Sequence, residues 1–223
     1  MHTMGKLFLF VLVSVICNSI FAQKEWVKLG LNFTNINRSS DTALVSTDAK
    51  LGFHLGGSLY IPLSDKIDFE TSLLYSNEGY QSDEAANISI LNGPIKTTSP
   101  LTTNLTYIDI PFGCRFHSTP VDERLFFADA GFYYSILLFA RQKQEYEQNG
   151  EQKNFKESMT IGSNSLDFVR RSDFGLTLGG GVELGFVQIG IHYDFGLLNI
   201  ASNQSQNSSI LNRNFRISLA LRN

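Results

Sequence analysis

The sequence lacks several features that stabilise or define common classes of protein. Almost no sustained helical period follows the first residues, so a helical fold is not indicated. The chain contains two cysteines, and one of them, Cys17, lies in an N-terminal segment that we expect to be removed. Because Cys114 would then be the remaining thiol, no intramolecular disulfide is expected, and stability must come from burial and backbone pairing.

There is also no excess of basic residues. The chain has 18 lysines and arginines and 21 aspartates and glutamates. Loss of the N-terminal segment would remove Lys6, so that 17 basic residues would face 21 acidic ones. A mildly acidic chain of this kind has no electrostatic basis for binding nucleic acid, and we predict no nucleic-acid partner.

The glycine motifs of nucleotide and hydrolase sites are missing as well. Residues 175–196 read GLTLGGGVELGFVQIGIHYDFG, but the position three after Gly181 is Leu184, so the G-x-G-x-x-G spacing is not met. A period-two run follows instead of a helix, and we expect a tight hairpin turn at Gly185 and Phe186. No G-x-S-x-G occurs, and no cofactor is predicted.

One long apolar run lies at the N-terminus. Residues 7–22 read LFLFVLVSVICNSIFA and end on the small residue Ala22, which is the layout of a cleaved signal peptide. A transmembrane anchor needs about 20 apolar residues, whereas polar residues interrupt this run. The sequence therefore predicts a signal peptide over 1–22 and a single mature domain over 23–223, with a lipoprotein modified at Cys17 as the alternative.

Apolar and polar residues alternate with period two along most of the remaining chain. Each alternating run is about as long as the 9 to 11 residues with which a tilted strand crosses a bilayer. The pattern predicts eight strands, over 27–33, 50–61, 67–76, 107–116, 126–135, 174–184, 187–196 and 214–222.

The connections between these strands alternate in length. Short turns are predicted at 62–65, 117–124 and 185–186, and long loops at 35–49, 80–102, 142–170 and 198–212. All long loops therefore fall at one end of an up-and-down arrangement, as in outer-membrane barrels, whose short turns face the periplasm. Residues 141–157, RQKQEYEQNGEQKNFKE, are interpreted as a mobile, solvated surface loop, with a partner-binding loop as the alternative.

Alternation alone does not decide which face is inside. A lipocalin-like barrel would bury the apolar set, whereas a membrane barrel shows that set to lipid. The polar face carries Gly, Ser and charges of both signs, which suits the narrow lumen of an eight-stranded barrel. Aromatic residues near the strand ends are predicted to form interfacial girdles: Trp26, Phe33, Tyr60, Tyr75, Tyr107, Phe116, Tyr193 and Phe215. Pro111, in mid-strand, predicts a bulge or a local gap in pairing.

Several segments resemble a known family in their order along the chain. They are VKLGLNFTN, GFHLGGSLYIPLSDKIDFETSLLYSNEGY, NLTYIDIPFGCRF, FADAGFYYSILL, DFGLTLGGGVEL and IGIHYDFGLLNI. From Val27 to Leu221 the chain resembles the PorT-like outer-membrane β-barrel family of Bacteroidetes, in which a strand Y-x-x-I-P carries its proline where Pro111 stands. The resemblance implies an eight-stranded outer-membrane barrel without a catalytic residue, and a link to protein secretion. The terminal ISLALRN departs from the usual aromatic end.

The polar face predicts a network of paired charges inside the barrel, because an unpaired charge in a narrow lumen would be costly to desolvate. This reading is preferred over a metal or proton-relay site, and the spacing of the histidines does not indicate a metal site. The predicted members are Lys50, His54, Asp68, Glu70, Asp109, Arg115, Asp129, Glu183, His192, Asp194 and Arg216.

An outer-membrane lipid A or phospholipid acyl hydrolase is the enzymatic alternative. Such an enzyme needs Ser, His and an acid near the lipid-facing rim. His54 and His192 fall on the polar face, and the one rim candidate, His117 beside Ser118, lies at a short turn. No catalytic residue is predicted.

Together these patterns predict an all-β protein, an eight-stranded antiparallel up-and-down transmembrane β-barrel in the outer membrane. Its expected role is structural or interactive, linked to protein secretion or envelope assembly, with the lumen plugged by charged side chains. The expected partners are outer-membrane lipid and an envelope protein contacted through the long loops. The runner-up is a secreted, soluble lipocalin-like carrier of an apolar ligand.

Overall fold

The computed structural model describes most of the chain after its first segment. The described residues are 24–40, 43–44, 47–83, 95–121, 124–148, 150–164, 167–202 and 208–222. The predicted signal peptide at 1–22 lies outside them, so it remains a prediction. In the described part of the chain, no helix has the length and apolar character needed to cross a bilayer.

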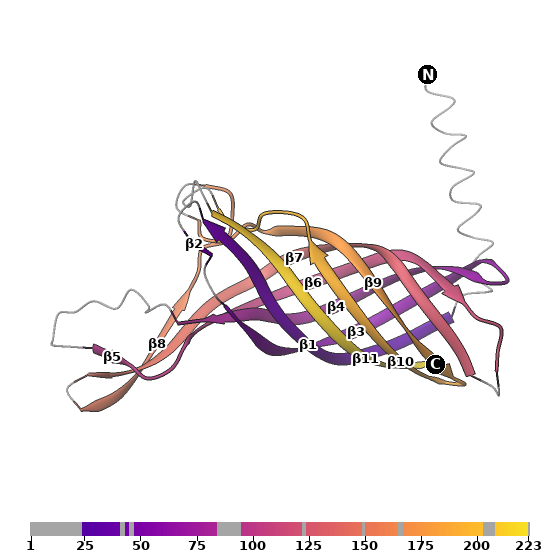
Figure 1. The fold of residues 1–223 in the computed structure, drawn as a ribbon, viewed down its shortest axis with the longest axis horizontal. Helices are drawn as coiled ribbons and strands as arrows, with labels where there is room; N and C mark the ends of the chain where they lie inside the picture. Colours follow the sequence, from indigo (N-terminus) through magenta and orange to yellow (C-terminus); the bar gives the residue numbers. More distant parts are fainter. Residues whose placement is uncertain are drawn as a thin grey trace, which may run out of the picture.

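Eight long strands form a closed antiparallel ring. They are β1 (Lys24–Ser40), β3 (Asp48–Ser64), β4 (Ile67–Ser82), β6 (Leu101–His117), β7 (Arg124–Gln148), β9 (Ser172–Leu184), β10 (Val187–Gly196) and β11 (Ser208–Arg222). Each long strand pairs with the next in sequence, and β11 pairs with β1 to close the ring (Figure 1). Closure leaves no free edge within the wall, as hydrocarbon requires. The predicted eight-stranded up-and-down barrel is confirmed.

Short and long connections lie at opposite ends of the barrel. Strands β3 and β4 are joined by a turn at Asp65 and Lys66. The β9–β10 hairpin turns at Gly185 and Phe186, as predicted, and Gly185 has a φ of 65°, a left-handed conformation that glycine adopts without strain. We call this the short-turn end, and we call the opposite end, where the strands extend into longer connections, the long-loop end (Figure 1).

The apolar face of the strands points outward and the polar face points into the lumen. Leu31 is 46% exposed and Ile191 52%, whereas Lys28 is 4% exposed and Asn32 is fully buried. A lipocalin-like carrier would have the reverse arrangement, so that alternative is wrong.

The prediction of aromatic girdles is correct for some of the named residues, which point outward, and wrong for others, which are buried. Phe33, Tyr75, Phe116 and Phe215 point outward, and Tyr193 is half-buried. Three others are buried in the barrel: Trp26, Tyr60 and Tyr107. The reason is strand parity, since Trp26 is two residues before the inward-facing Lys28 and its ring packs edge-on against Tyr60.

Two irregularities interrupt the wall. Pairing between β4 and β6 stops at Thr71 opposite Phe112 and resumes at Leu74 opposite Asp109, which leaves Pro111 in the predicted local gap. A β-bulge in β7 lies opposite Thr106 and Tyr107 and adds one residue, Leu138. Because of this extra residue, Leu137 and Ala140 both point inward although they are three positions apart.

Strand β7 continues beyond the barrel and forms a hairpin with β8 (Glu151–Ser158), while β5 (Ile95–Thr97) pairs with its other side. A further short strand, β2 (Ala43–Leu44), pairs with β1. Figure 1 shows β5 and β8 projecting from the long-loop end. The prediction of a loop over 141–157 is therefore wrong for the described residues, which form paired strands. The missed signal was the dipeptide Asn-Gly at 149–150, typical of hairpin turns, in which Gly150 has a φ of 79°.

A cluster of buried apolar residues lies at the long-loop end of the lumen, and we call it the apolar cap. Leu105, Leu137 and Ala140 point inward from the wall and pack against Val169 and Ile200 from the connections that follow β8 and β10. Backbone hydrogen bonds hold these connections in place, including one from the Arg170 amide to the Ile200 carbonyl at 2.8 Å. The lumen beneath the cap contains most of the buried charges.

Candidate functional site

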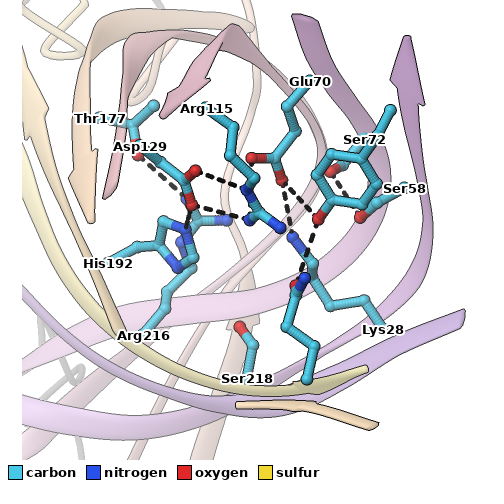
Figure 2. Close-up of polar contacts among 12 residues, drawn as sticks. Lys28, Ser58, Glu70, Ser72, Arg115, Asp129, Thr177, His192, Arg216 and Ser218 are labelled. Atoms are coloured by element: carbon cyan, nitrogen blue, oxygen red, sulfur yellow. Dashed lines mark hydrogen bonds and ion pairs between the residues drawn. The ribbon is translucent and has the colours of Figure 1, made fainter. Parts of the chain in front are cut away.

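The centre of the lumen is organised around Arg115 of β6. Its guanidinium donates two hydrogen bonds to Asp129 of β7, from Nε to Oδ1 at 2.7 Å and from Nη2 to Oδ2 at 2.8 Å. A third bond, from Nη2 to Oε2 of Glu70 on β4, measures 3.2 Å. This geometry is the two-pronged recognition of carboxylate for which arginine is suited, and Figure 2 shows it in the middle of the barrel.

Neighbouring groups complete this central cluster. The guanidinium carbon of Arg115 lies 4.3 Å from the centre of the Tyr60 ring and 3.7 Å from that of Phe127. Lys28 of β1 donates to Oε1 of Glu70 at 3.0 Å, and Nε2 of His192 on β10 lies 2.9 Å from Oδ2 of Asp129. Two fixed cations thus face two carboxylates, and the contacts join strands on opposite sides of the lumen.

One set of residues in this cluster has the composition of a metal site. The ligand atoms of Glu70, Asp129 and His192 lie within 4.8 Å of one another. However, the same carboxylates already bind Arg115 and Lys28 at ion-pair distances. A metal ion would have to displace a buried guanidinium that fits its partners well, so this arrangement favours a structural ion network.

A second cluster, nearer the long-loop end, contains more acids than bases. Arg216 of β11 donates to Oδ1 of Asp194 at 2.8 Å. Asn214 donates to Glu78 at 3.0 Å, and Asp109 has one buried carboxylate oxygen, Oδ1, without a hydrogen-bond partner in the described structure. Glu78, Asp109 and Asp194 line one small cavity with Arg216, which forms its described ion pair with Asp194, and we call this group the acidic cluster.

We predict that an aspartate-to-asparagine substitution affects the free energy of unfolding differently in the central cluster and in the acidic cluster. We expect Asp129→Asn to lower the free energy of unfolding by about 3 kcal/mol, because the buried guanidinium of Arg115 then faces a neutral amide in place of a carboxylate. Asp109→Asn should leave that free energy unchanged or raise it, since it removes a surplus negative charge. Urea unfolding of the protein folded into lipid vesicles measures both. Equal destabilisation by the two variants would show that the charge assignment is wrong.

The structure buries all eleven residues of the predicted network on the inward face. It does not join them in one network. His54 contacts Asn32 and Ser218 at 2.7 and 2.9 Å, Lys50 contacts Asn77 at 2.7 Å, and Asp68 contacts His117 at 2.7 Å. Glu183 lies 3.6 Å from Arg222 at the short-turn end. That these groups serve packing and not chemistry stays a prediction.

Sequence reasoning left out several inward-facing partners. Lys28, Glu78 and Asp173 are all buried in the lumen. Asp173 accepts hydrogen bonds from Tyr133 at 3.0 Å and Asn212 at 2.8 Å. The sequence could have indicated these residues, because each stands at an alternating position that belongs to the polar face of its strand. Glu78 and Asp173 lie just outside the strand limits predicted from the alternation.

The rim candidate for catalysis does not form a triad in the described structure. His117 contacts Asp68 through Nε2 at 2.7 Å, while its buried Nδ1 has no hydrogen-bond partner. The Ser118 hydroxyl donates to the Thr119 carbonyl and accepts from the Phe126 amide. A hydrolase needs the serine hydroxyl on the free histidine nitrogen, and this geometry does not provide it.

The lumen has little free space between these side chains. A cavity of about 20 Å³ lies among Glu70, Pro111 and Arg216, and another of about 10 Å³ lies among Asp109, Asp194 and Arg216. Each is at the lower limit for holding about one water molecule. Both cavities are small, and the apolar cap lies above them toward the long-loop end.

Comparison with known proteins identifies a family that this barrel matches and several solved structures that it resembles. The family model described as an outer membrane protein beta-barrel domain matches residues 21–202. Among solved structures, the chain is similar to Ail, the attachment invasion locus protein of Yersinia pestis, with 11% identity, a TM-score of 0.42, and 90% of this chain and 99% of Ail covered. It is also similar to Neisserial surface protein A, with 10% identity, a TM-score of 0.43, and 89% and 97% covered.

A third similar structure is the outer membrane protein AlkL, with 13% identity, a TM-score of 0.38, and 90% of each chain covered. No curated protein matches the chain. The family match covers well over half of the sequence, and the closed ring with its apolar exterior agrees with it. The chain therefore belongs to the outer membrane protein beta-barrel domain family and is an outer-membrane β-barrel protein.

Proposed function

We propose that this protein is a non-conducting barrel that anchors an interaction surface in the outer membrane. The observation that carries the proposal is the filled lumen. Arg115 of β6 bridges Glu70 and Asp129 of the two neighbouring strands, the adjoining cavities measure about 20 and 10 Å³, and the apolar cap lies at the long-loop end. A passage for solutes would need a continuous path, and the described side chains that occupy the lumen support the proposal that there is none.

The three-stranded extension β5–β7–β8 is the surface proposed for the partner. Every residue of β8 pairs with β7, from Ser158 opposite Arg141 to Glu151 opposite Gln148. The ladder makes this extension more ordered than an ordinary surface loop, and most of its β8 side chains are exposed. An ordered sheet presents a fixed set of side chains, so less conformational entropy is lost when a partner binds.

The finer features of the proposal rest on the sequence. The resemblance to the PorT-like family of Bacteroidetes supports a role in protein secretion or envelope assembly. The layout of residues 1–22 supports export with cleavage after Ala22. Short turns of outer-membrane barrels face the periplasm, so the long-loop end is proposed to lie outside the cell, where an envelope protein would contact it. The enzymatic alternative has no assembled triad in the described structure to support it.

Bilayer recordings test the filled lumen. We expect the purified protein, reconstituted in planar bilayers, to give no stable conductance steps, because ion pairs and the apolar cap occupy the lumen. A porin in the same bilayers is the positive control, and heat-modifiable migration on a gel verifies that the protein is folded. Reproducible single-channel steps from folded protein would refute a non-conducting barrel.

Cysteine labelling on intact cells tests the orientation and the partner surface. In a Cys114→Ser background, Asn154→Cys of β8 should react with an impermeant maleimide, whereas Ser118→Cys at a short turn should react only after lysis. Both positions are exposed, so accessibility to solvent is matched. A photo-crosslinking residue at Asn154 should then capture a specific envelope protein. Labelling of both cysteines, or of neither, on intact cells would contradict the orientation, and no crosslinked partner would contradict the proposed role of the extension.

A further inference from the structure

Three cations lie together on the outward face where β7 leaves the barrel. Arg141 and Lys143 follow Phe139 at steps of two residues, so all three side chains point the same way. Lys156 of β8 lies directly opposite Lys143 in the hairpin. Like charges at directly opposed positions destabilise a strand pair. Among the described residues, none of the three cations forms an ion pair, and Glu145, the next residue on this face of β7, forms none with them, so no described ion pair relieves this repulsion.

The cations line a recess of about 740 Å³ on the outer surface. Its other walls include Tyr75, Asn77 and Asn104. Lys50 donates to Oδ1 of Asn77 at 2.7 Å, which places a further positive charge behind this wall. The one acidic residue in this described lining, Glu157, is paired with Gln142 and so belongs to the opposite face of the hairpin from Lys143 and Lys156. The charged face of the recess is therefore cationic.

The recess lies at the boundary between the apolar and polar parts of the exterior. Phe139 is 54% exposed and Tyr75 is 42% exposed, and both belong to the lipid-facing surface of the barrel. Arg141 lies beyond Phe139 in the direction of the long-loop end, with its guanidinium carbon 5.9 Å from the ring centre. An occupant that fits both parts carries acyl chains on one side and negative charge on the other. An acidic peptide would match the cations but would leave the aromatic wall unused.

We propose that this recess binds the phosphate-bearing headgroup of a lipid in the outer leaflet. Arg141, Lys143 and Lys156 hold the phosphate groups, while Phe139 and Tyr75 contact the acyl chains. Basic pockets beside membrane-spanning segments bind anionic headgroups in this way. The bound phosphate also relieves the repulsion between the two lysines. The assignment to the outer leaflet rests on the orientation proposed above, whereas the lipid chemistry of the site does not depend on it.

Binding of lipid A by the full-length mature chain tests the proposal. In detergent, diphosphorylated lipid A should bind, and Lys143→Gln with Lys156→Gln should weaken it by about fivefold for each lysine, or roughly 25-fold together. The matched control is Lys153→Gln, which removes the same charge from the same strand but on the opposite face, and it should change the affinity less than about twofold. Lys143→Arg with Lys156→Arg should retain binding. Native mass spectrometry measures the bound fraction.

Two further probes identify the source of the phosphate. Lipid A without its phosphates should bind at least as weakly as the double glutamine variant binds the diphosphorylated form, and inorganic pyrophosphate should compete poorly. Equal binding of both lipid forms, or full competition by pyrophosphate, would overturn the lipid-phosphate site. Without lipid, the double glutamine variant should melt at the same temperature as the parent or higher, and a lower melting temperature would contradict the unrelieved repulsion.

The outcome in cells separates this inference from the proposed function. If lipid A binds in detergent but Asn154→Cys is labelled only after lysis, the site stands and the assignment to the outer leaflet falls. If Asn154→Cys is labelled on intact cells and lipid A does not bind, the orientation stands and the lipid site is wrong.

Discussion

Arg115→Met is expected to lower the free energy of unfolding by about 3 to 5 kcal/mol, enough to prevent stable folding of many small domains. Arg115 is 1% exposed and is the group that joins Glu70 to Asp129. Removing it leaves two buried carboxylates, Glu70 with Lys28 and the Tyr60 hydroxyl and Asp129 with His192, beside a cavity that has space for about one water molecule. The gel shift of folded against heated protein and urea titration in vesicles measure the loss.

A rim variant and a compensated variant make this prediction specific. Arg222→Met removes the same charge at the short-turn end, where the ion pair to Glu183 is 3.6 Å long and the arginine side chain is 39% exposed, and it should cost less than about 1 kcal/mol. Arg115→Met combined with Asp129→Asn should recover part of the loss, because one unpaired charge is removed. If the compensated variant were no more stable than Arg115→Met alone, the loss would come from packing against Tyr60 and Phe127 and not from charge.

Ile191→Arg is expected to have the second large effect, a loss of about 2 to 4 kcal/mol. Ile191 is 52% exposed in the middle of β10, between outward-facing residues of β9 and β11. In a soluble protein, an exposed isoleucine tolerates arginine at little cost. At the midplane of a bilayer, the guanidinium must leave water, so the cost depends on depth.

The control is the same substitution at a position nearer the membrane surface, where it should cost less. Phe186 is 67% exposed at the β9–β10 turn, and Phe186→Arg should cost about 0 to 1 kcal/mol. The comparison is made by urea unfolding in vesicles and repeated in detergent micelles, where the difference between the two variants should shrink. Equal effects in vesicles would mean that the apolar belt does not lie in hydrocarbon as the fold implies.

The alternation of side chains was enough to predict the strands of the barrel, and the composition of the polar set was needed to predict which face meets lipid. In β1, the residues from Val27 to Phe33 alternate between apolar and polar, and a strand must place these two sets on opposite faces. The surplus of glycine and charge on the polar set then predicted that this set faces a narrow lumen. The same parity rule, applied to the aromatic residues, would have placed Trp26 inside.

The pairing of the lumen charges could not be predicted in this way. Parity predicts that Arg115, Glu70 and Asp194 point inward, but it does not say which acid meets which base. That choice depends on the tilt of the strands and the stagger between them, which bring residues of β4, β6, β7 and β10 to one level. The separation into a balanced central cluster and the acidic cluster is therefore a result of the closed ring.

At the long-loop end, too, the sequence predicted some features and the tertiary structure decided others. Composition predicted a polar, charged segment over 141–157, and the charges are there. The extra residue Leu138 reverses the inward and outward alternation of β7 beyond the bulge. Arg141 and Lys143 therefore point to the exterior, and Lys143 lies opposite Lys156. The sequence by itself determined the strands and which of their faces meets lipid, because the alternation of side chains and the composition of each face are local properties. Only the tertiary structure decided which charges meet, because closure and the bulge fix contacts between residues far apart in the chain.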